Sequence, residues 1–213
     1  MSLTHHVLLI TGGGESFHDN LGAALAIAEA LEAASISVTR STRADDVSQL
    51  ADGTYTCVAL YTAKDFLTDA HVEQIAAFVR AGGGLLALHG ATATHKQNTT
   101  WTKLVGGMFT GHPPGFEFTV NVSDPQHPIA RGLSDYVGHD ELYTHDMHDT
   151  VHTFLSAPWE NKIHPLGWSK SEGKGRVVYL ASGHSPLMLR HPTVRTLIAR
   201  GARFAGGSDE TQD

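Results

Sequence analysis

Three short apolar runs in the first 90 positions constrain the fold more than any other feature of the sequence. HVLLIT (residues 6–11), TCVALYT (56–62) and GLLALH (84–89) are apolar at nearly every position rather than at alternate ones. Strands with this pattern are buried on both faces, as in a parallel sheet covered by helices. The segments between the runs carry helical periodicity, which predicts an α/β fold.

Two of these intervening segments carry helix start and stop signals. Residues 19–35 begin with Asp19 and Asn20, either of which can cap the first turn. Residues 68–82 run from a threonine cap, Thr68, to Gly82. A short strand over residues 36–41 follows the first helix. The faces expected to pack on the sheet are Leu21, Leu25, Ala28 and Leu31 in the first helix and Val72, Ile75, Ala76 and Val79 in the second.

The pattern changes between Trp101 and Trp168, where β-like runs replace helical periods. A further apolar strand within residues 173–184 ends in Gly-His, and a helix over 191–205 has Pro192 in its first turn. We expect a three-layer α/β sandwich with a mostly parallel central sheet and a β-rich excursion. One domain would span residues 1–205, and a disordered polar tail residues 206–213. The β-like runs are 116–122, 141–144, 151–156 and 164–171.

Charge and composition exclude several classes of partner. The chain has 213 residues with 15 basic and 22 acidic side chains, so its net charge is −7 with histidine neutral. No basic patch is present, which argues against nucleic acid and anionic membranes as partners. A single cysteine, Cys57, rules out an intramolecular disulfide. The absence of a long apolar run or a signal-like start predicts a cytoplasmic protein, and general base rates allow a homodimer.

Two apolar strands end in a histidine, His89 and His184. If both strands lie in one parallel sheet, both histidines reach its carboxyl edge, where α/β folds bind their ligands. The loop after the first strand, with Gly12–Gly14 and His18, reaches the same edge. Histidine can serve there as acid, base or metal ligand. The alternative is that each ring only caps its strand by binding a loop carbonyl.

Several motifs, taken in order, resemble one family. They are GGGLLALHGATATH, WTKLVGGMFTGHPPGFEF, DPQHPIARGL, HDELY and GKGRVVYLASGH. Together they resemble the trehalose-utilisation (ThuA-like) family from about Thr11 to Phe204. The resemblance implies a class I glutamine amidotransferase-like fold, a flavodoxin-like sandwich with a mixed central sheet.

The resemblance also sharpens the role of the two histidines. In the amidotransferases the residue that matches His89 is the nucleophilic cysteine, and the residue that matches His184 is the triad histidine. Here the position of the nucleophile, at the end of the strand, holds His89 instead of a cysteine. Pro186 stands where the amidotransferases carry a carboxylate. Thioester chemistry on glutamine is therefore excluded. Glu141, in the family motif HDELY, is the candidate carboxylate, which gives His89, His184 and Glu141 as the predicted catalytic group.

Further residues are predicted to bind the substrate. The glycine loop would let backbone approach a ligand, and His18 and His112 fall in motifs that match the family. Trp101 and Tyr143 could offer aromatic faces to a sugar, although packing explains them equally well. The predicted substrate-binding residues are Gly13, Gly14, His18, Trp101, His112 and Tyr143.

Cofactor motifs are weak. TGGGESFH (residues 11–18) places Phe17 where a dinucleotide fingerprint needs its third glycine, so no nucleotide cofactor is expected. HDMHD (residues 145–149) has the composition of a metal cluster, but a polar loop between two strands explains it. Binding of a divalent metal, with zinc the favoured ion, is an open alternative at His89, His184 and Glu141. Two histidines and a carboxylate make a common zinc ligand set.

The leading hypothesis is an enzyme of carbohydrate metabolism that acts on a small sugar, a glucoside or its oxidised keto form. The sugar class comes from the family resemblance. No pair of facing carboxylates is evident, which argues against an ordinary glycosidase. Two alternatives stay open: a non-catalytic sugar-binding or regulatory module on an amidotransferase-like scaffold, and a metal-dependent hydrolase of another small molecule.

Overall fold

A nine-stranded sheet in the order β2-β1-β3-β4-β11-β10-β9-β6-β7 forms the centre of the protein. The computed structural model describes residues 5–208. The first five strands of this order run parallel to one another. The apolar side chains of β1, β3, β4 and β11 are buried on both faces, as their sequence pattern predicts, whereas the edge strand β2 is partly exposed. These strands are β1 (His6–Gly12), β2 (Ser37–Ser41), β3 (Cys57–Thr62), β4 (Gly84–Leu88) and β11 (Gly175–Leu180).

The β-rich excursion extends the same sheet instead of forming a separate one. From β11 outward every pairing is antiparallel, so the expected mostly parallel sheet is in fact mixed. The cause is a tight turn at Gly173, with φ +60°, that returns the chain directly beside its previous strand. The added strands are β10 (Lys162–Glu172), β9 (His152–Trp159), β6 (Phe116–Val122) and β7 (Tyr136–Asp140), while β5 (Gly107–Gly111) and β8 (Thr144–Met147) pair separately.

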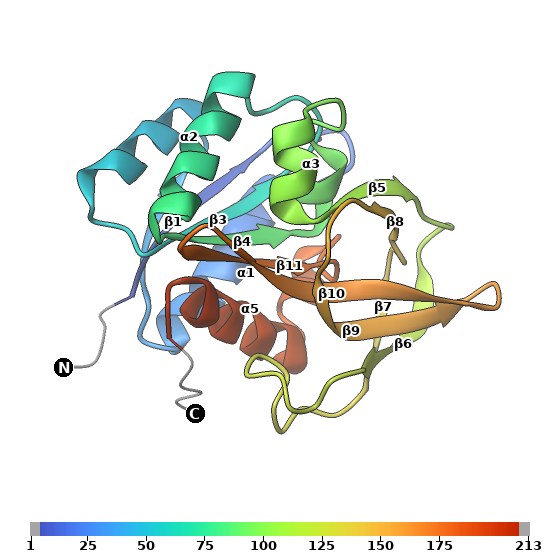
Figure 1. The fold of residues 1–213 in the computed structure, drawn as a ribbon. Coiled ribbons are helices and arrows are strands. Elements are labelled where there is room, and N and C mark those ends of the chain that lie inside the picture. Colours follow the sequence, from blue (N-terminus) through green and yellow to red (C-terminus); the bar gives the residue numbers. More distant parts are fainter. Residues whose placement is uncertain (1–4, 209–213) are drawn as a thin grey trace.

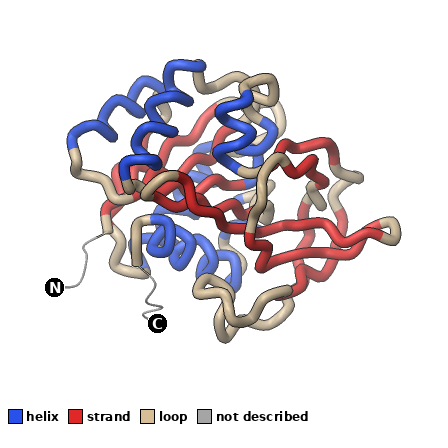
Figure 2. Tube along the Cα trace, viewed as in Figure 1, coloured by secondary structure: helices blue, strands red, loops and turns tan. Residues whose placement is uncertain are grey.

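Helices cover the parallel half on both faces (Figures 1 and 2). On one face α1 packs against β1 and β2, and α5 against β4 and β11; on the other face α2 and α3 pack beside each other. The bounds are α1 (Asn20–Ala33), α2 (Asp69–Ala81), α3 (Thr99–Val105), α4 (Pro186–Leu189) and α5 (Pro192–Ala205), with 3-10 helices η1 (Ala44–Asp52) and η2 (His89–Ala93). No helix within residues 5–208 is both long and apolar enough to cross a membrane.

The predicted inner face of α1 is wrong in part. Leu21 and Leu25 are 71% and 39% exposed, and the buried side of the helix is built largely from alanines together with Ile27 and Leu31. Small side chains let α1 approach both the sheet and α5 closely. The alanine side of the helix is therefore buried, although leucine has the larger apolar side chain. The predicted face of α2 is confirmed, and Thr68 caps it by accepting a hydrogen bond from the His71 N–H.

The end of β7 and the start of β8 determine where two predicted site residues lie. Residues 141–144 are predicted as a strand, but β7 ends at Asp140 and β8 begins at Thr144, so Glu141 and Tyr143 lie in the connection. A connection can direct consecutive side chains into a site, because it is not bound to the alternating pattern of a strand.

At the C-terminal end of the chain, α5 stops at Ala205. Of the tail predicted to be disordered, residues 209–213 lie outside the described residues.

Candidate active site

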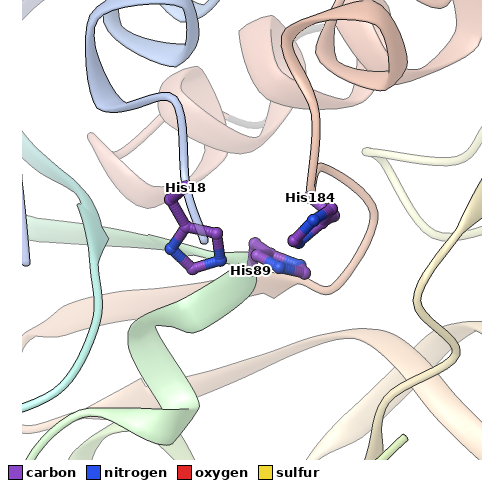
Figure 3. Close-up of side chains that lie close together, drawn as sticks. All are labelled: His18, His89 and His184. Carbon is purple, nitrogen blue, oxygen red and sulfur yellow. The ribbon is translucent and has the colours of Figure 1, made fainter. Parts of the chain in front are cut away.

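Three histidines meet at the carboxyl edge of the parallel strands. His18 follows β1, His89 follows β4, and His184 follows β11, so each comes from a different loop. Figure 3 shows the three rings turned toward one another. The ring centroid of His18 lies 5.1 Å from that of His89 and 5.3 Å from that of His184. The convergence expected of His89 and His184 is therefore present, and His18 joins them.

His89 occupies a sharp elbow between β4 and η2. Its φ is +43°, a left-handed value that a residue with a β-carbon rarely adopts, and its side chain is fully buried. The next residue must be small, because a β-carbon on Gly90 would lie 2.9 Å from the Thr62 carbonyl oxygen and 3.0 Å from Cε1 of His18. The backbone at this elbow thus presents the His89 ring to the neighbouring loops.

Hydrogen bonds fix the orientation of the His89 ring. Nδ1 lies 2.9 Å from the carbonyl oxygen of Ala181, and only an N–H can bind a carbonyl there. In the neutral ring Nε2 therefore carries the lone pair, and it accepts a hydrogen bond from the Tyr143 hydroxyl at 3.0 Å. The ring is held from both sides with Nε2 facing the cluster.

Glu141 contacts three imidazoles. Its Oε2 lies 3.2 Å from Nδ1 of His184 and 3.6 Å from Nε2 of His89, and its Oε1 lies 3.5 Å from Nε2 of His112. Burial alone would raise the pKa of Glu141, but hydrogen bonding to His184 and His89 outweighs burial and holds the pKa well below its usual range. The same interaction with Glu141 raises the pKa of His184, against the effect of burial. We refer to His18, His89, His184 and Glu141 as the edge cluster.

His18 adds an unsatisfied buried nitrogen to the edge cluster. The residue is 7% exposed, and its Nε2 is buried without a hydrogen-bond partner. Burial lowers its pKa to about 3, and the nearby charges of His89 and His184 add to this effect. The ring is thus a neutral imidazole with a nitrogen lone pair available among its neighbours.

Asp140 positions the His184 loop, and the sequence reasoning missed it. Its buried carboxylate accepts hydrogen bonds from the N–H groups of Gly183 at 2.7 Å and His184 at 3.0 Å. Tyr61 completes the restraint by donating its hydroxyl to the Gly183 and His184 carbonyl oxygens. The only signal available in the sequence was the position of Asp140 beside Glu141 in HDELY.

The other predicted binding residues divide between the site and the core. Tyr143 touches His89, and His112, with a side chain 32% exposed, lies at the open side of Glu141. Trp101 requires a correction, because it is fully buried and its Nε1 donates to the Ala91 carbonyl oxygen. It supports η2 from below and cannot present its face to a sugar.

The glycine loop has a steric explanation. Gly13 and Gly14 have φ values of +76° and +69°, and a β-carbon on Gly13 would lie 2.1 Å from the Ala63 carbonyl oxygen. Both glycines are therefore required by the turn and by its packing on the end of β3. The turn places His18 in the edge cluster, since the N–H of His18 binds the Gly14 carbonyl oxygen.

A second group of histidines lies on the antiparallel side of the sheet. His127 and His152 line a cavity of about 630 Å³ together with Asp124 and Ser169. Nδ1 of His127 accepts the Ile129 N–H, so its Nε2 donates to Ser169 Oγ at 2.9 Å, and Nε2 of His152 binds Asp124 at 2.7 Å. Because His127 donates to Ser169, it cannot take the serine proton as a base. We refer to Asp124, His127, His152 and Ser169 as the second cluster.

The HDMHD segment is partly strand. His145 lies in β8, where Nε2 contacts the hydroxyls of Thr92 and Tyr179 at 3.2 and 3.3 Å. Burial lowers the pKa of His145 to about 3. Within residues 5–208, the one group of at least three candidate metal-binding side chains with converging donor atoms is His18, His89 and His184. The polar loop predicted over residues 145–149 is wrong for residues 145–147, which belong to β8.

Comparisons with known proteins place this architecture. A putative ThuA-like protein from Parabacteroides merdae has a TM-score of 0.85 at 18% identity, over 99% of this chain and 93% of that one. A cytoplasmic protein from Salmonella typhimurium LT2 has a TM-score of 0.67 at 18% identity, over 94% and 99%. Part of a β-galactosidase from Rahnella sp. R3 has a TM-score of 0.63 at 17% identity, over 92% of this chain and 31% of that one.

At such identities the structural matches show a shared fold. No curated protein sequence matches the chain. The family is shown by a sequence model, described as trehalose utilisation, that matches residues 6–205 and so covers the whole sheet and the edge cluster. The chain belongs to the ThuA trehalose-utilisation family.

Proposed function

We propose that the protein is an enzyme of carbohydrate metabolism that acts on a small sugar, a glucoside or its oxidised keto form, at the edge cluster. The observation that carries this proposal is the meeting of His89, His184 and Glu141 at the carboxyl edge of the sheet. The sugar class is supported by the description of the family, trehalose utilisation, which implies carbohydrate metabolism.

The site opens to solvent beside Glu141. The side chains of His112 and His184 are each 32% exposed, whereas those of His89 and Glu141 are 0% and 17% exposed. A sugar that enters from this side meets the Glu141 carboxylate, an acceptor for sugar hydroxyls, before it reaches the buried rings. Phe109 and Tyr143, whose ring centroids are 4.3 Å apart, add an aromatic wall near His112.

Each group has a chemical role in this proposal. Glu141 accepts a hydrogen bond from the reacting hydroxyl, and Nε2 of His89 can accept another through its lone pair. His184, whose pKa Glu141 raises, polarises the neighbouring oxygen. His112, whose Nε2 lies 3.5 Å from Oε1 of Glu141, connects that carboxylate with the open side of the site. Burial raises the pKa of Tyr143 above its usual value, so its hydroxyl stays protonated. Once substrate occupies Nε2 of His89, that hydroxyl can donate to a carbonyl oxygen instead of to the ring.

We do not propose glutamine amidotransferase activity. The elbow residue is His89, and Cys57 is fully buried in β3. The order β2-β1-β3-β4-β11 of the parallel strands nevertheless supports the flavodoxin-like kinship that the sequence suggests. The scaffold would then have exchanged one chemistry for another. We also propose a cytoplasmic location, with support from the description of the Salmonella relative.

The test is NMR detection of product from a panel of glucosides and keto-glucosides. Tyr143→Phe should lower kcat/KM by about 10²-fold, because it removes a donor beside the reacting oxygen and keeps the ring. Tyr55→Phe is the matched control, since the Tyr55 hydroxyl binds Gln49 in η1. A sugar that binds without being turned over would favour a sugar-binding module and overturn the enzyme proposal. No interaction with any sugar would overturn the substrate class.

A further inference from the structure

The three rings of the edge cluster have the positions that a metal site requires. Each of His18, His89 and His184 offers one nitrogen, and these atoms all lie within 4.8 Å of one another. A tetrahedral zinc ion with bonds of about 2.0–2.1 Å needs nitrogens about 3.3 Å apart, so a movement of about 1 Å in each ring closes the site. The loops that carry the rings follow strands of one sheet, which keeps their backbones in register.

The remaining nitrogens are held as in histidines that bind metals. Nδ1 of His89 donates to the Ala181 carbonyl oxygen, and Nδ1 of His184 lies 3.2 Å from the Glu141 carboxylate. Metal-binding histidines generally give their second nitrogen to a carbonyl or a carboxylate, which fixes the ring and makes it a stronger ligand. Nε2 of His89 faces the cluster, where a metal ion would replace the Tyr143 hydroxyl as its partner, and Nε2 is the nitrogen left on the His184 ring.

His18 supplies an independent observation. Its Nε2 is buried and has no hydrogen-bond partner, although an unsatisfied buried nitrogen destabilises the folded state. The ring lies edge-on to both other histidines, with centroids 5.1 and 5.3 Å away. A cation among the three rings would satisfy this nitrogen, and the ionised Glu141 beside them would balance its charge.

We propose that His18, His89 and His184 form a three-histidine site for a divalent transition metal, zinc by preference, with Glu141 as an outer carboxylate. Three imidazole nitrogens without sulfur suit zinc and leave a fourth position open. The assignment replaces the ligand set expected from the sequence, in which Glu141 completed the shell. It deepens the proposed function and rests on it only for what occupies the open position, namely a sugar oxygen.

The test measures metal binding without any sugar. Chelator-treated protein is titrated with zinc by calorimetry, and Co²⁺ absorption reports the coordination geometry. We expect one zinc per chain and tetrahedral Co²⁺ bands. His18→Gln and His184→Gln should weaken zinc by at least about 100-fold, and Glu141→Gln by about 10- to 100-fold, as for an outer partner. His152→Gln, in the second cluster, is the matched histidine control and should bind as the wild type does.

Each outcome separates this inference from the proposed function. Absence of zinc and Co²⁺ binding, or binding that His18→Gln and His184→Gln leave unchanged, overturns the metal site and leaves sugar chemistry to be judged by the NMR screen. Octahedral Co²⁺ bands, or a loss with Glu141→Gln as complete as with His18→Gln, would overturn the assignment of Glu141 to the outer shell. Tight zinc binding without sugar turnover would sustain the metal site and count against the enzyme.

Discussion

The edge cluster and the second cluster contain the same kinds of residue but differ in how their hydrogen bonds are satisfied. Each pairs histidines with an acid, and each has a buried histidine whose pKa burial lowers, to about 3 for His18 and about 4 for His127. In the second cluster both nitrogens of His127 have partners, whereas Nε2 of His18 has none. The edge cluster therefore differs from the second cluster in holding a buried ring with an unsatisfied nitrogen, and this difference marks it as the candidate site.

Removing the negative charge of the acid in each cluster should give the largest difference in activity between the edge cluster and the second cluster. Glu141→Gln is expected to lower kcat/KM on the sugar substrate by about 10²- to 10⁴-fold, because three imidazoles lose their shared carboxylate. Asp124→Asn should leave kcat/KM within about twofold, since Asp124 lies at an exposed pair outside the site. Steady-state kinetics on both variants checks the comparison, and equal losses would contradict it.

Loss of Asp140 should be the largest change in stability. Asp140→Ala leaves the N–H groups of Gly183 and His184 without their acceptor, and we expect the free energy of unfolding to fall by about 3 kcal/mol. Asp124→Ala should cost about 1 kcal/mol or less, because its contacts are exposed. Urea denaturation measures both. An Asp140→Ala variant as stable as Asp124→Ala would show that Asp140 does not hold the His184 loop.

Low pH should destabilise the folded protein at the second cluster through protonation linked to His127. Burial, then the charge of His152, lowers the folded-state pKa of His127 to about 4, below the unfolded value of about 6.5. The unfolded chain therefore takes up a proton as pH falls, and the stability contributed by neutral His127 is complete above about pH 6.5 and is lost toward pH 4.

His127→Asn should reduce the slope of unfolding free energy against pH between 6.5 and 4 by up to about one proton, or about 1.4 kcal/mol per pH unit. The groups that face His127 are His152, Asp124 and Ser169, so Asp124→Asn serves as the control for the nearby charge. Urea denaturation at several pH values measures the slope. An unchanged slope in His127→Asn would assign the acid sensitivity to other histidines, among them His145.

The smallest effect is expected at His152. Its ring pairs with Asp124 at a half-exposed position, and such pairs contribute little in water. His152→Gln should shift the melting temperature by no more than about 2 °C. Differential scanning calorimetry gives the shift, and a drop of many degrees would show that the second cluster depends on this pair after all.

The meeting of His89 and His184 could be predicted because strand ends are visible in the sequence. Each follows a buried run, and parallel strands bring their carboxyl ends to one edge. The place of Glu141 came from the family motif and not from spacing, since it lies in the connection after β7. The strand topology thus predicts that His89 and His184 share one edge of the sheet, and the family motif identifies Glu141 as their carboxylate.

The rest depended on side-chain packing that the sequence does not display. Trp101 has the residue type of a sugar platform, but packing beneath η2 buries it. Leu21 has the residue type of a core leucine, yet the alanines of α1 form the buried face. The role of Asp140 depends on the register that sets β7 against the His184 loop, which no local pattern reveals.

The left-handed backbone at His89 places opposing selective pressures on one residue. This conformation costs a residue with a β-carbon about 1–2 kcal/mol, so relief of strain favours glycine at position 89. The convergence with His18 and His184 favours an imidazole instead. Mutational drift toward a more stable elbow would discard the ring that completes the cluster. Stability and activity are thus expected to trade against each other at residue 89, and a stabilised variant chosen without an activity screen would lose function there first.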